Sequence, residues 1–296
     1  MAKIGFWFVK AIAFWISITP FSLLYLRSDA YFLLLYHLVR YRRKVVRDNL
    51  VKSFPEKTPA EIKHIGKRFY HNLCDVFVEI CKLMRITPEK LSQHVTFTNP
   101  EVLQGLCDKK KSVFAAIPHS GNWEWYGKLM HTSTQHKCMA IYKKVKNPYF
   151  DAFMMDLRTN FHVDQECVVE SSVALKTLVR RKNLLNAVLI IGDQSPRGVE
   201  SDYWTDFLHR DTCWFYGLER MAKMLDYAVV FVDMVRVKRG YYDVTYSVIS
   251  EDPKSTPEGF IMEQYVRHIE RFIKDNPDNW LWSHRRWKHS RKPQQG

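Results

Sequence analysis

The sequence has few of the residues that mark small disulfide-stapled, fibrous or disordered chains. Its 296 residues include 6 cysteines, 11 glycines and 12 prolines, with no CxxC pair, internal repeat or low-complexity stretch. These absences exclude disulfide scaffolds, collagen-like chains and long disordered regions, and the scattered cysteines predict reduced thiols. Because 46% of the residues are hydrophobic, the chain can bury the core of one large domain or two modest ones.

Acidic residues are scarce relative to basic ones. The chain has 31 Asp and Glu against 45 Lys and Arg, a formal charge of +14. This excess predicts an acidic partner: nucleic acid, an anionic membrane, or a phosphorylated or acidic-protein substrate. Helix-turn-helix, zinc-finger and RNP-like patterns are absent, and an aromatic content of 14% suits a membrane interface. We therefore expect no nucleic acid partner.

An apolar run occupies residues 4–26 and is interrupted only by Lys10 and Pro20. Its length is close to the ~20 residues that span a bilayer core. It lacks a convincing small-x-small cleavage site, so a retained anchor is favoured over a signal peptide. Because of Lys10 and Pro20, a helix lying in the interface, or a re-entrant pair, remains the alternative.

Two basic clusters flank the body of the chain. One follows the apolar run and comprises Arg40, Arg42, Arg43 and Lys44. Such clusters stay on the cytoplasmic side and attract anionic headgroups at about 1 kcal/mol per charge, which predicts that the body faces the cytoplasm. The other includes Arg285, Arg286 and Lys288 beside tryptophans. It is interpreted as a headgroup-binding strip, the alternative being a packed basic tail.

The spacing of apolar residues predicts the fold class. Over residues 58–91 they recur every three or four positions, with a capping box at Thr58 and Glu61 and with Pro88 closing the helix. After Asn99, β-rich runs alternate with helical patterns. The runs are 112–117, 138–142, 187–191, 228–234 and 244–249, and the helices are 123–131, 147–159 and 217–225.

This alternation predicts a single α/β domain with helices covering a mixed sheet, preceded by an N-terminal membrane-associated helical segment. Residues 1–40 would form the anchor and residues 41–98 a helical connector that carries the first basic cluster. Residues 99–296 would form the α/β catalytic body.

Residues 112–128 read as a strand, a polar turn and a helix that carry His119 and Glu124. Inside one helix, five residues of separation would turn the two side chains about 140° apart, so they can meet only if His119 precedes the helix. Gly121 permits the bend, and Ser120 or Asn122 can cap the helix.

In that arrangement Glu124 holds one ring nitrogen of His119 while the other faces a substrate, which is a general base with an orienting group. A core or surface ion pair is the alternative on spacing alone. Without a GxSxG elbow, the proton to be removed belongs to a substrate hydroxyl, and no covalent intermediate is expected. Since HExxH and a third ligand are absent, we expect no metal.

The segment His119-Ser-Gly-Asn-Trp-Glu124 resembles the HxxxxE signature of the lysophospholipid acyltransferase superfamily. Its Trp-before-Glu form is similar to that of the bacterial lipid A secondary (lauroyl/myristoyl) acyltransferases. Further similar segments follow in order: 141–161 with Arg158, IGDQSPRG with Asp193 and Gln194, FYGLERMAK, and PDNWLWSHRRWK. The resemblance covers nearly the whole chain.

The resemblance implies a membrane-bound O-acyltransferase of lipid A and lipopolysaccharide biosynthesis at the inner membrane. The acyl donor would be an acyl carrier protein thioester, and the acceptor a hydroxyl of a 3-hydroxyacyl chain on a phosphorylated glycolipid, without a cofactor. Another lipid acceptor, a lysophospholipid or an aminoacyl lipid, is the alternative. A basic membrane or nucleic-acid binding protein is more remote.

The same comparison suggests substrate-binding residues. The thioester oxyanion would meet the helix N-terminus near Gly121 and Asn122, or the cation Arg158. Arg158 is read as a phosphate or oxyanion contact, or else as a helix-surface residue. Asp193 ends a strand at the carboxyl edge, where α/β sheets place ligands, or else is a cap. Gln194 and Arg197 follow as further substrate contacts.

Overall fold

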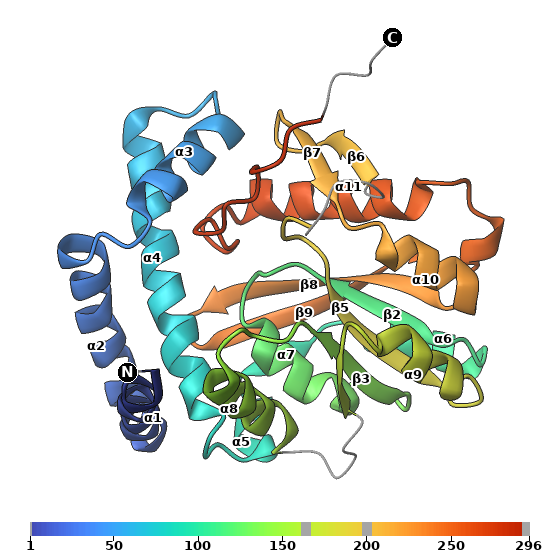
Figure 1. The fold of residues 1–296 in the computed structure, drawn as a ribbon, viewed down its shortest axis with the longest axis horizontal. Helices are drawn as coiled ribbons and strands as arrows, with labels where there is room; N and C mark the ends of the chain where they lie inside the picture. The colour runs from blue at the N-terminus through green and yellow to red at the C-terminus, as the bar shows by residue number, and fades with distance from the viewer. Residues whose placement is uncertain (1, 161–166, 197–202, 292–296) are drawn as a thin grey trace.

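A seven-stranded mixed sheet lies at the centre of the computed structural model, which describes residues 2–160, 167–196 and 203–291 (Figure 1). The strand order is β1-β9-β8-β2-β5-β3-β4. All neighbours are parallel except β8 and β9, so the predicted α/β class and mixed sheet are confirmed. The strands are β1 (Val95–Phe97), β2 (Val113–Ile117), β3 (Lys137–Tyr142), β4 (Val168–Glu170), β5 (Asn186–Ile191), β8 (Ala228–Lys238) and β9 (Tyr241–Ser250).

Helices cover both faces of the sheet because side chains alternate between the faces along each strand. The buried hydrophobic residues therefore form two clusters. One cluster includes residues of α6, α7 and α8, and the other includes residues of α9, α10 and α11. The predicted helices correspond to α7, α8 and α10. The bounds are α6 (Glu101–Asp108), α7 (Trp123–Leu129), α8 (Pro148–Thr159), α9 (Ala174–Arg180), α10 (Gly217–Leu225) and α11 (Phe260–Asp275).

The N-terminal apolar run forms two helices, α1 (Ala2–Ile18) and α2 (Phe21–Leu33), which continue into a π-helical turn, η1 (Leu34–Leu38). Pro20 separates them because it lacks a backbone N–H and fixes φ. Helices α1, α2 and α3 (Arg43–Ser53) pack against the long α4 (Pro59–Lys82), at one end of the sheet (Figure 1). Among the described residues, no helix combines the length and apolar character needed to cross a bilayer.

The predicted capping box at the start of α4 is confirmed. Thr58 N donates to Glu61 Oε2 at 2.8 Å, and Glu61 N donates to Thr58 Oγ1 at 3.3 Å. The prediction that Pro88 closes this helix is wrong. The helix ends at Lys82, and Pro88 opens α5 (Pro88–Ser92), because proline is well tolerated in a first helical turn. None of the six cysteines, all within the described residues, forms a disulfide.

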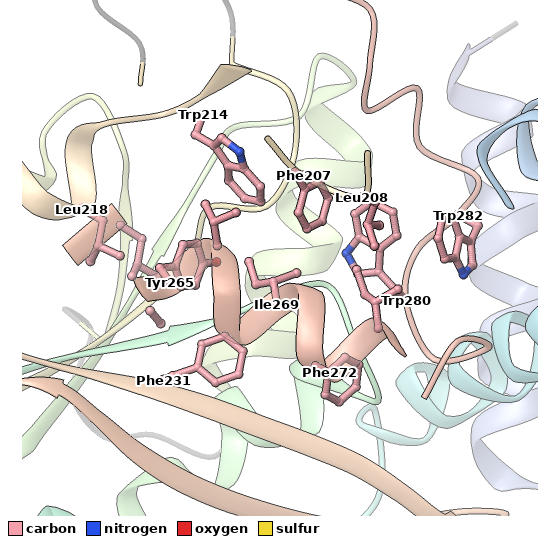
Figure 2. Packing of buried hydrophobic residues seen from close by; sticks show 14 of the residues in the cluster. Phe207, Leu208, Trp214, Leu218, Phe231, Tyr265, Ile269, Phe272, Trp280 and Trp282 are labelled. Carbon is pink, nitrogen blue, oxygen red and sulfur yellow. The ribbon is translucent and has the colours of Figure 1, made fainter. Parts of the chain in front are cut away.

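Aromatic residues surround α11 in one buried cluster. Phe207, between the short strands β6 (Tyr203–Asp206) and β7 (Asp211–Trp214), lies beside Trp280 of the C-terminal segment (Figure 2). Trp280 and Trp282 meet edge to face, with ring centroids 4.8 Å apart, a favourable geometry for aromatic pairs. The C-terminal segment is therefore part of the core.

Candidate active site

His119 and Asp193 meet at the carboxyl edge of two neighbouring parallel strands. Ile117 of β2 pairs with Ile191 of β5, and each polar residue stands two positions beyond its strand. His119 Nδ1 lies 2.6 Å from Asp193 Oδ1, and His119 N donates to Asp193 Oδ2 at 3.0 Å. The side chain of Asp193 is 1% exposed, whereas that of His119 is 18% exposed. Asp193 is thus a buried partner for a histidine that reaches solvent.

The surroundings keep Asp193 ionised. Trp280 Nε1 donates to its Oδ2 at 2.7 Å. Burial by itself raises the pKa of Asp193, but the charge and hydrogen bonds of His119, together with Trp280, outweigh this and hold the pKa below its ordinary value. An ionised Asp193 favours the proton on Nδ1, leaving Nε2 as the acceptor. Nε2 lies 3.2 Å from the Gln194 side-chain amide nitrogen, which can donate to it.

Glu124 does not hold His119, so that part of the predicted arrangement is wrong. Arg158 of α8 donates two hydrogen bonds to the Glu124 carboxylate, from Nε to Oε2 at 2.9 Å and from Nη2 to Oε1 at 2.5 Å. Such two-point pairs are strong and geometrically specific. Because Asp193 already occupies the Nδ1 side of His119, Glu124 is left to orient Arg158.

The predicted bend before α7 is confirmed. Gly121 has a positive φ of 54°, which glycine adopts readily, and Trp125 N donates to the capping Asn122 Oδ1 at 3.1 Å. Gly121 and Asn122 are both buried, and neither lines the cavity described next. Gly121 N donates to Asn279 O at 3.3 Å. Their predicted part in oxyanion binding stays a prediction.

A cavity of about 1220 Å³ opens at His119 and is also lined by Glu124, Arg158 and Gln194. It exceeds the roughly 300–1,000 Å³ of common small-ligand pockets. Its walls draw on both buried clusters, so it wraps around the carboxyl edge of β3 and β5. The α7–α8 side is lined by Trp123, Met130, Cys138, Ala140, Leu189 and Ile191. The α9–α10 side is lined by Met139, Ile141, Ala174, Ile190, Tyr216 and Met221.

The two sides of the cavity differ in polarity. The α7–α8 side carries the Glu124–Arg158 pair and Lys128, an almost fully buried residue. Burial lowers the pKa of Lys128 to about 8, against the attraction of Cys167 and Glu124. The α9–α10 side is mainly apolar. The cavity therefore has a charged side and a mainly apolar side, and His119 lines it.

Most residues of the two predicted basic clusters are exposed. Arg40 and Arg42 lie between η1 and α3, Arg43 and Lys44 open α3, and Arg285 and Lys288 lie in the C-terminal segment. Their predicted role in headgroup contact stays a prediction.

Arg286 departs from this pattern. It is only 2% exposed, and its guanidinium lies 4.2 Å from the ring centroid of Trp214. The prediction that it contacts headgroups is therefore wrong, because the aromatic core encloses it. Burial also lowers its pKa to about 10.

One remaining candidate, Arg197, and one residue that the sequence did not suggest, Trp280, complete the picture. Arg197 lies outside the described residues. Trp280 was not a candidate from the sequence, although its indole donates directly to Asp193. His119 and Asp193 each stand two residues after an apolar strand. This shared spacing is the sequence signal from which their contact could have been predicted. Within the described part of the chain, no group of three or more His, Cys, Asp or Glu side chains is arranged to hold a metal ion.

Comparison with known proteins identifies the family of the chain. A search of curated proteins gives no match. The model of the family described as bacterial lipid A biosynthesis acyltransferase matches residues 1–289, which include every residue placed above around the cavity. A histidine paired with a buried carboxylate, beside a cavity with a charged and an apolar side, suits acyl transfer to a hydroxyl. The chain belongs to the bacterial lipid A biosynthesis acyltransferase family, and it is an acyltransferase.

Proposed function

We propose that the chain transfers a fatty acyl group from an acyl carrier protein thioester to a hydroxyl of a 3-hydroxyacyl chain on a lipid A precursor. The observation that carries this proposal is the His119–Asp193 pair beside the two-sided cavity. Family membership gives acyl transfer in lipid A biosynthesis. The carrier-protein donor, the hydroxyl acceptor and the membrane-bound state belong to the proposal.

The chemistry starts at His119 Nε2, the ring nitrogen opposite Asp193. It removes the proton from the acceptor hydroxyl as the oxygen attacks the thioester carbonyl carbon, and Asp193 stabilises the resulting imidazolium. The tetrahedral intermediate then collapses, the carbon–sulfur bond breaks, and the imidazolium returns its proton to the departing thiolate. The products are an ester and the free thiol of the carrier, and no acyl-enzyme forms.

Arg158 is the candidate for stabilising negative charge. The pair with Glu124 uses Nε and Nη2, so Nη1 is left out of that pair. We assign Nη1 to the thioester oxyanion or to a phosphate of the acceptor, since guanidinium groups bind such oxygens well. Glu124 then acts by fixing the orientation of Arg158.

The two sides of the cavity suit different parts of the substrates. The α9–α10 side offers the alkyl chain of the donor an apolar wall of Met139, Ala174 and Met221. The α7–α8 side, with Arg158 and Lys128, suits the phosphorylated acceptor. Its exposed rim carries Lys143, Lys144 and Lys146, whose charge favours an acidic carrier protein.

A membrane-binding surface follows from the exposure of the first two helices and η1. The N-terminal apolar surface comprises Trp7, Phe8, Trp15, Leu23, Leu26, Leu33 and Leu38, each more than half exposed. The adjoining cations Arg40, Arg42 and Arg43 would meet anionic headgroups. Exposed aromatic and aliphatic side chains beside cations are typical of helices that lie in the interface, and this position would place the acyltransferase on the cytoplasmic face of the inner membrane.

Mass spectrometry of lipid A tests the proposal. Cells that lack the protein should lose one secondary acyl chain, and wild-type protein should restore it while a His119→Ala variant should not. Purified protein with a labelled acyl carrier protein and the underacylated lipid should form the same ester. Unchanged lipid A, with an altered phospholipid or aminoacyl lipid, would instead support another lipid acceptor.

A further inference from the structure

Glu79 of α4 is a fully buried carboxylate that takes no part in the proposed chemistry. Its Oε2 accepts hydrogen bonds from Tyr242 Oη at 2.6 Å and Asn122 Nδ2 at 2.9 Å, and its Oε1 accepts one from Tyr25 Oη at 3.1 Å. Burying an unsatisfied carboxyl group is unfavourable, and these three donors satisfy it. Burial raises the pKa of Glu79 while Tyr242 and Asn122 oppose the rise.

Glu79 is connected to the catalytic turn through Asn122. One end of the Asn122 amide accepts from Trp125 N and caps α7, and the other donates to Glu79. The main-chain oxygen of Glu79 also accepts from Trp125 Nε1 at 3.0 Å. Two separate hydrogen bonds therefore hold the first turn of α7 against α4.

The turn has little freedom on its other sides. A Cβ on Gly121 would lie 2.7 Å from the Met234 carbonyl oxygen, and Asp193 holds both the main chain and the ring of His119. Residues 119–124 are thus fixed by Asp193 at one end and by Glu79 in the middle. A shift at Asn122 would move both His119 and the Glu124–Arg158 pair.

The same carboxylate reaches the N-terminal helices. Tyr25 belongs to α2, which also carries Leu23 and Leu26 of the N-terminal apolar surface. One turn before Glu79, Asp75 binds Arg239, and Arg239 also pairs with Asp29 of α2 at 2.6 Å. Helix α2 is thereby attached to α4 at Glu79 and, through Arg239, one turn before it.

We propose that Glu79 is a positioning residue for acyl transfer, which holds the His119 turn in place through Asn122 and joins that turn to α2 through Tyr25. This inference rests on the proposed function only where kcat is measured. The hydrogen bonds of Glu79 do not depend on the substrate. It explains why a buried carboxyl group stands where four elements, α2, α4, β9 and the start of α7, converge.

The central test compares Glu79→Gln with Glu79→Leu. In Glu79→Gln the side-chain oxygen can still accept from Asn122 and Tyr242 while the new amide donates to the Tyr25 hydroxyl, so this variant should keep kcat within about threefold of wild type. Leucine offers no acceptor, and kcat should fall about 10- to 100-fold, since misplacing reacting groups by ~1 Å has effects of that order. KM should change less than kcat, because the apolar α9–α10 side of the cavity is unaltered.

An Asn122→Ser variant separates positioning from loss of fold. Serine still caps α7 but lacks the amide that reaches Glu79, so kcat should fall as in Glu79→Leu. The double variant should lose no more than either single one, as expected for two residues acting through one contact. Fully additive losses, or a Glu79→Gln variant as impaired as Glu79→Leu, would overturn the proposal.

Tyr242 and Tyr246 provide a matched control. Both are buried on β9, and both hydroxyls are hydrogen-bonded, but Tyr242 binds Glu79 and Tyr246 binds Ser133. Tyr242→Phe should lower kcat more than Tyr246→Phe at similar thermal stability, and equal kcat losses would count against the proposal. Nitrogen NMR of the His119 ring gives a readout independent of turnover. Its signals should shift in Glu79→Leu but not in Glu79→Gln, even if the acyl acceptor proves to be a different lipid.

Discussion

Replacing Asp193 by asparagine should nearly abolish acyl transfer without unfolding the protein. Asp193 Oδ2 accepts from two groups that can only donate, His119 N and Trp280 Nε1. The asparagine oxygen must therefore take the Oδ2 position, which places the amide NH2 against His119 Nδ1. That nitrogen is then forced to accept, and the ring proton moves to Nε2, where the base is needed.

The size of the effect follows from this change of tautomer. Losing the correct tautomer of a base while keeping its position lowers kcat about 10⁴-fold in the comparable serine protease case. This corresponds to about 5.5 kcal/mol of activation free energy. The free energy of unfolding should change little, because both donors keep their acceptor. Asp193→Ala, by contrast, leaves two buried donors unsatisfied and should destabilise by about 1–3 kcal/mol for each.

Single-turnover acyl transfer, thermal unfolding and nitrogen NMR of the histidine rings measure the three consequences. Asp193→Asn should move the His119 ring proton from Nδ1 to Nε2. Glu124→Gln, the same chemical change on the other carboxylate, should leave the tautomer unaltered. Transfer by Asp193→Asn within tenfold of wild type, or a tautomer change in Glu124→Gln instead, would refute the assignment of Asp193 as the partner of His119.

Further predictions concern the cavity, the surface and pH. Arg158→Lys loses the two-point grip on Glu124 and should lower kcat at least tenfold in the same assay, and near-normal turnover would rule out the charge-stabilising role. Ala174→Phe fills the α9–α10 side and should shift the product, by mass spectrometry, to shorter acyl chains, whereas an unchanged length distribution would place the donor chain elsewhere. Trp15 is 62% exposed, and Trp15→Glu should weaken sedimentation with anionic vesicles. The free energy of unfolding should change by less than about 0.5 kcal/mol. Full retention of vesicle binding would show that Trp15 is not part of the membrane-binding surface. Because the pKa of Asp193 is held below its ordinary value of 3.8, its ionisation stabilises the fold above about pH 4 and this stability is lost as pH falls through the lowered pKa. In urea unfolding, the stability of Asp193→Asn should accordingly depend less on pH in that acidic range than the stability of wild type. An identical pH dependence in the two proteins would contradict the lowered pKa of Asp193.

Much of the fold could be predicted because local patterns determine it. The strands β2 and β5 of the central sheet are short apolar runs, and α7 and α8 are amphipathic with polar caps. Predicted boundaries were less accurate where proline was involved, since Pro88 opens a helix where a stop was expected. Helix α11 was not among the predicted helices, although its Tyr265, Ile269 and Phe272 belong to the buried cluster in Figure 2.

The site was predicted only in part because its contacts are remote in sequence. His119 and Glu124 are near neighbours along the chain, which favoured pairing them, whereas the ring actually contacts Asp193, 74 residues away. Strand register creates that contact, and register is not a local property. The burial of Arg286 could not be predicted from the sequence either, because it depends on tertiary packing against Trp214.

The contact of Trp280 with Asp193 has a consequence for the order in which the protein is made. Asp193 follows His119 by 74 residues, and Trp280 follows Asp193 by 87. At about 5–20 residues per second, each interval takes about 4 to 17 s of translation. Helices α1 and α2 leave the ribosome well before Asp193 is available to His119. Trp280, which donates to Asp193, is made later still. The proposed membrane-binding surface is thus made while the nascent chain is still unable to transfer an acyl group.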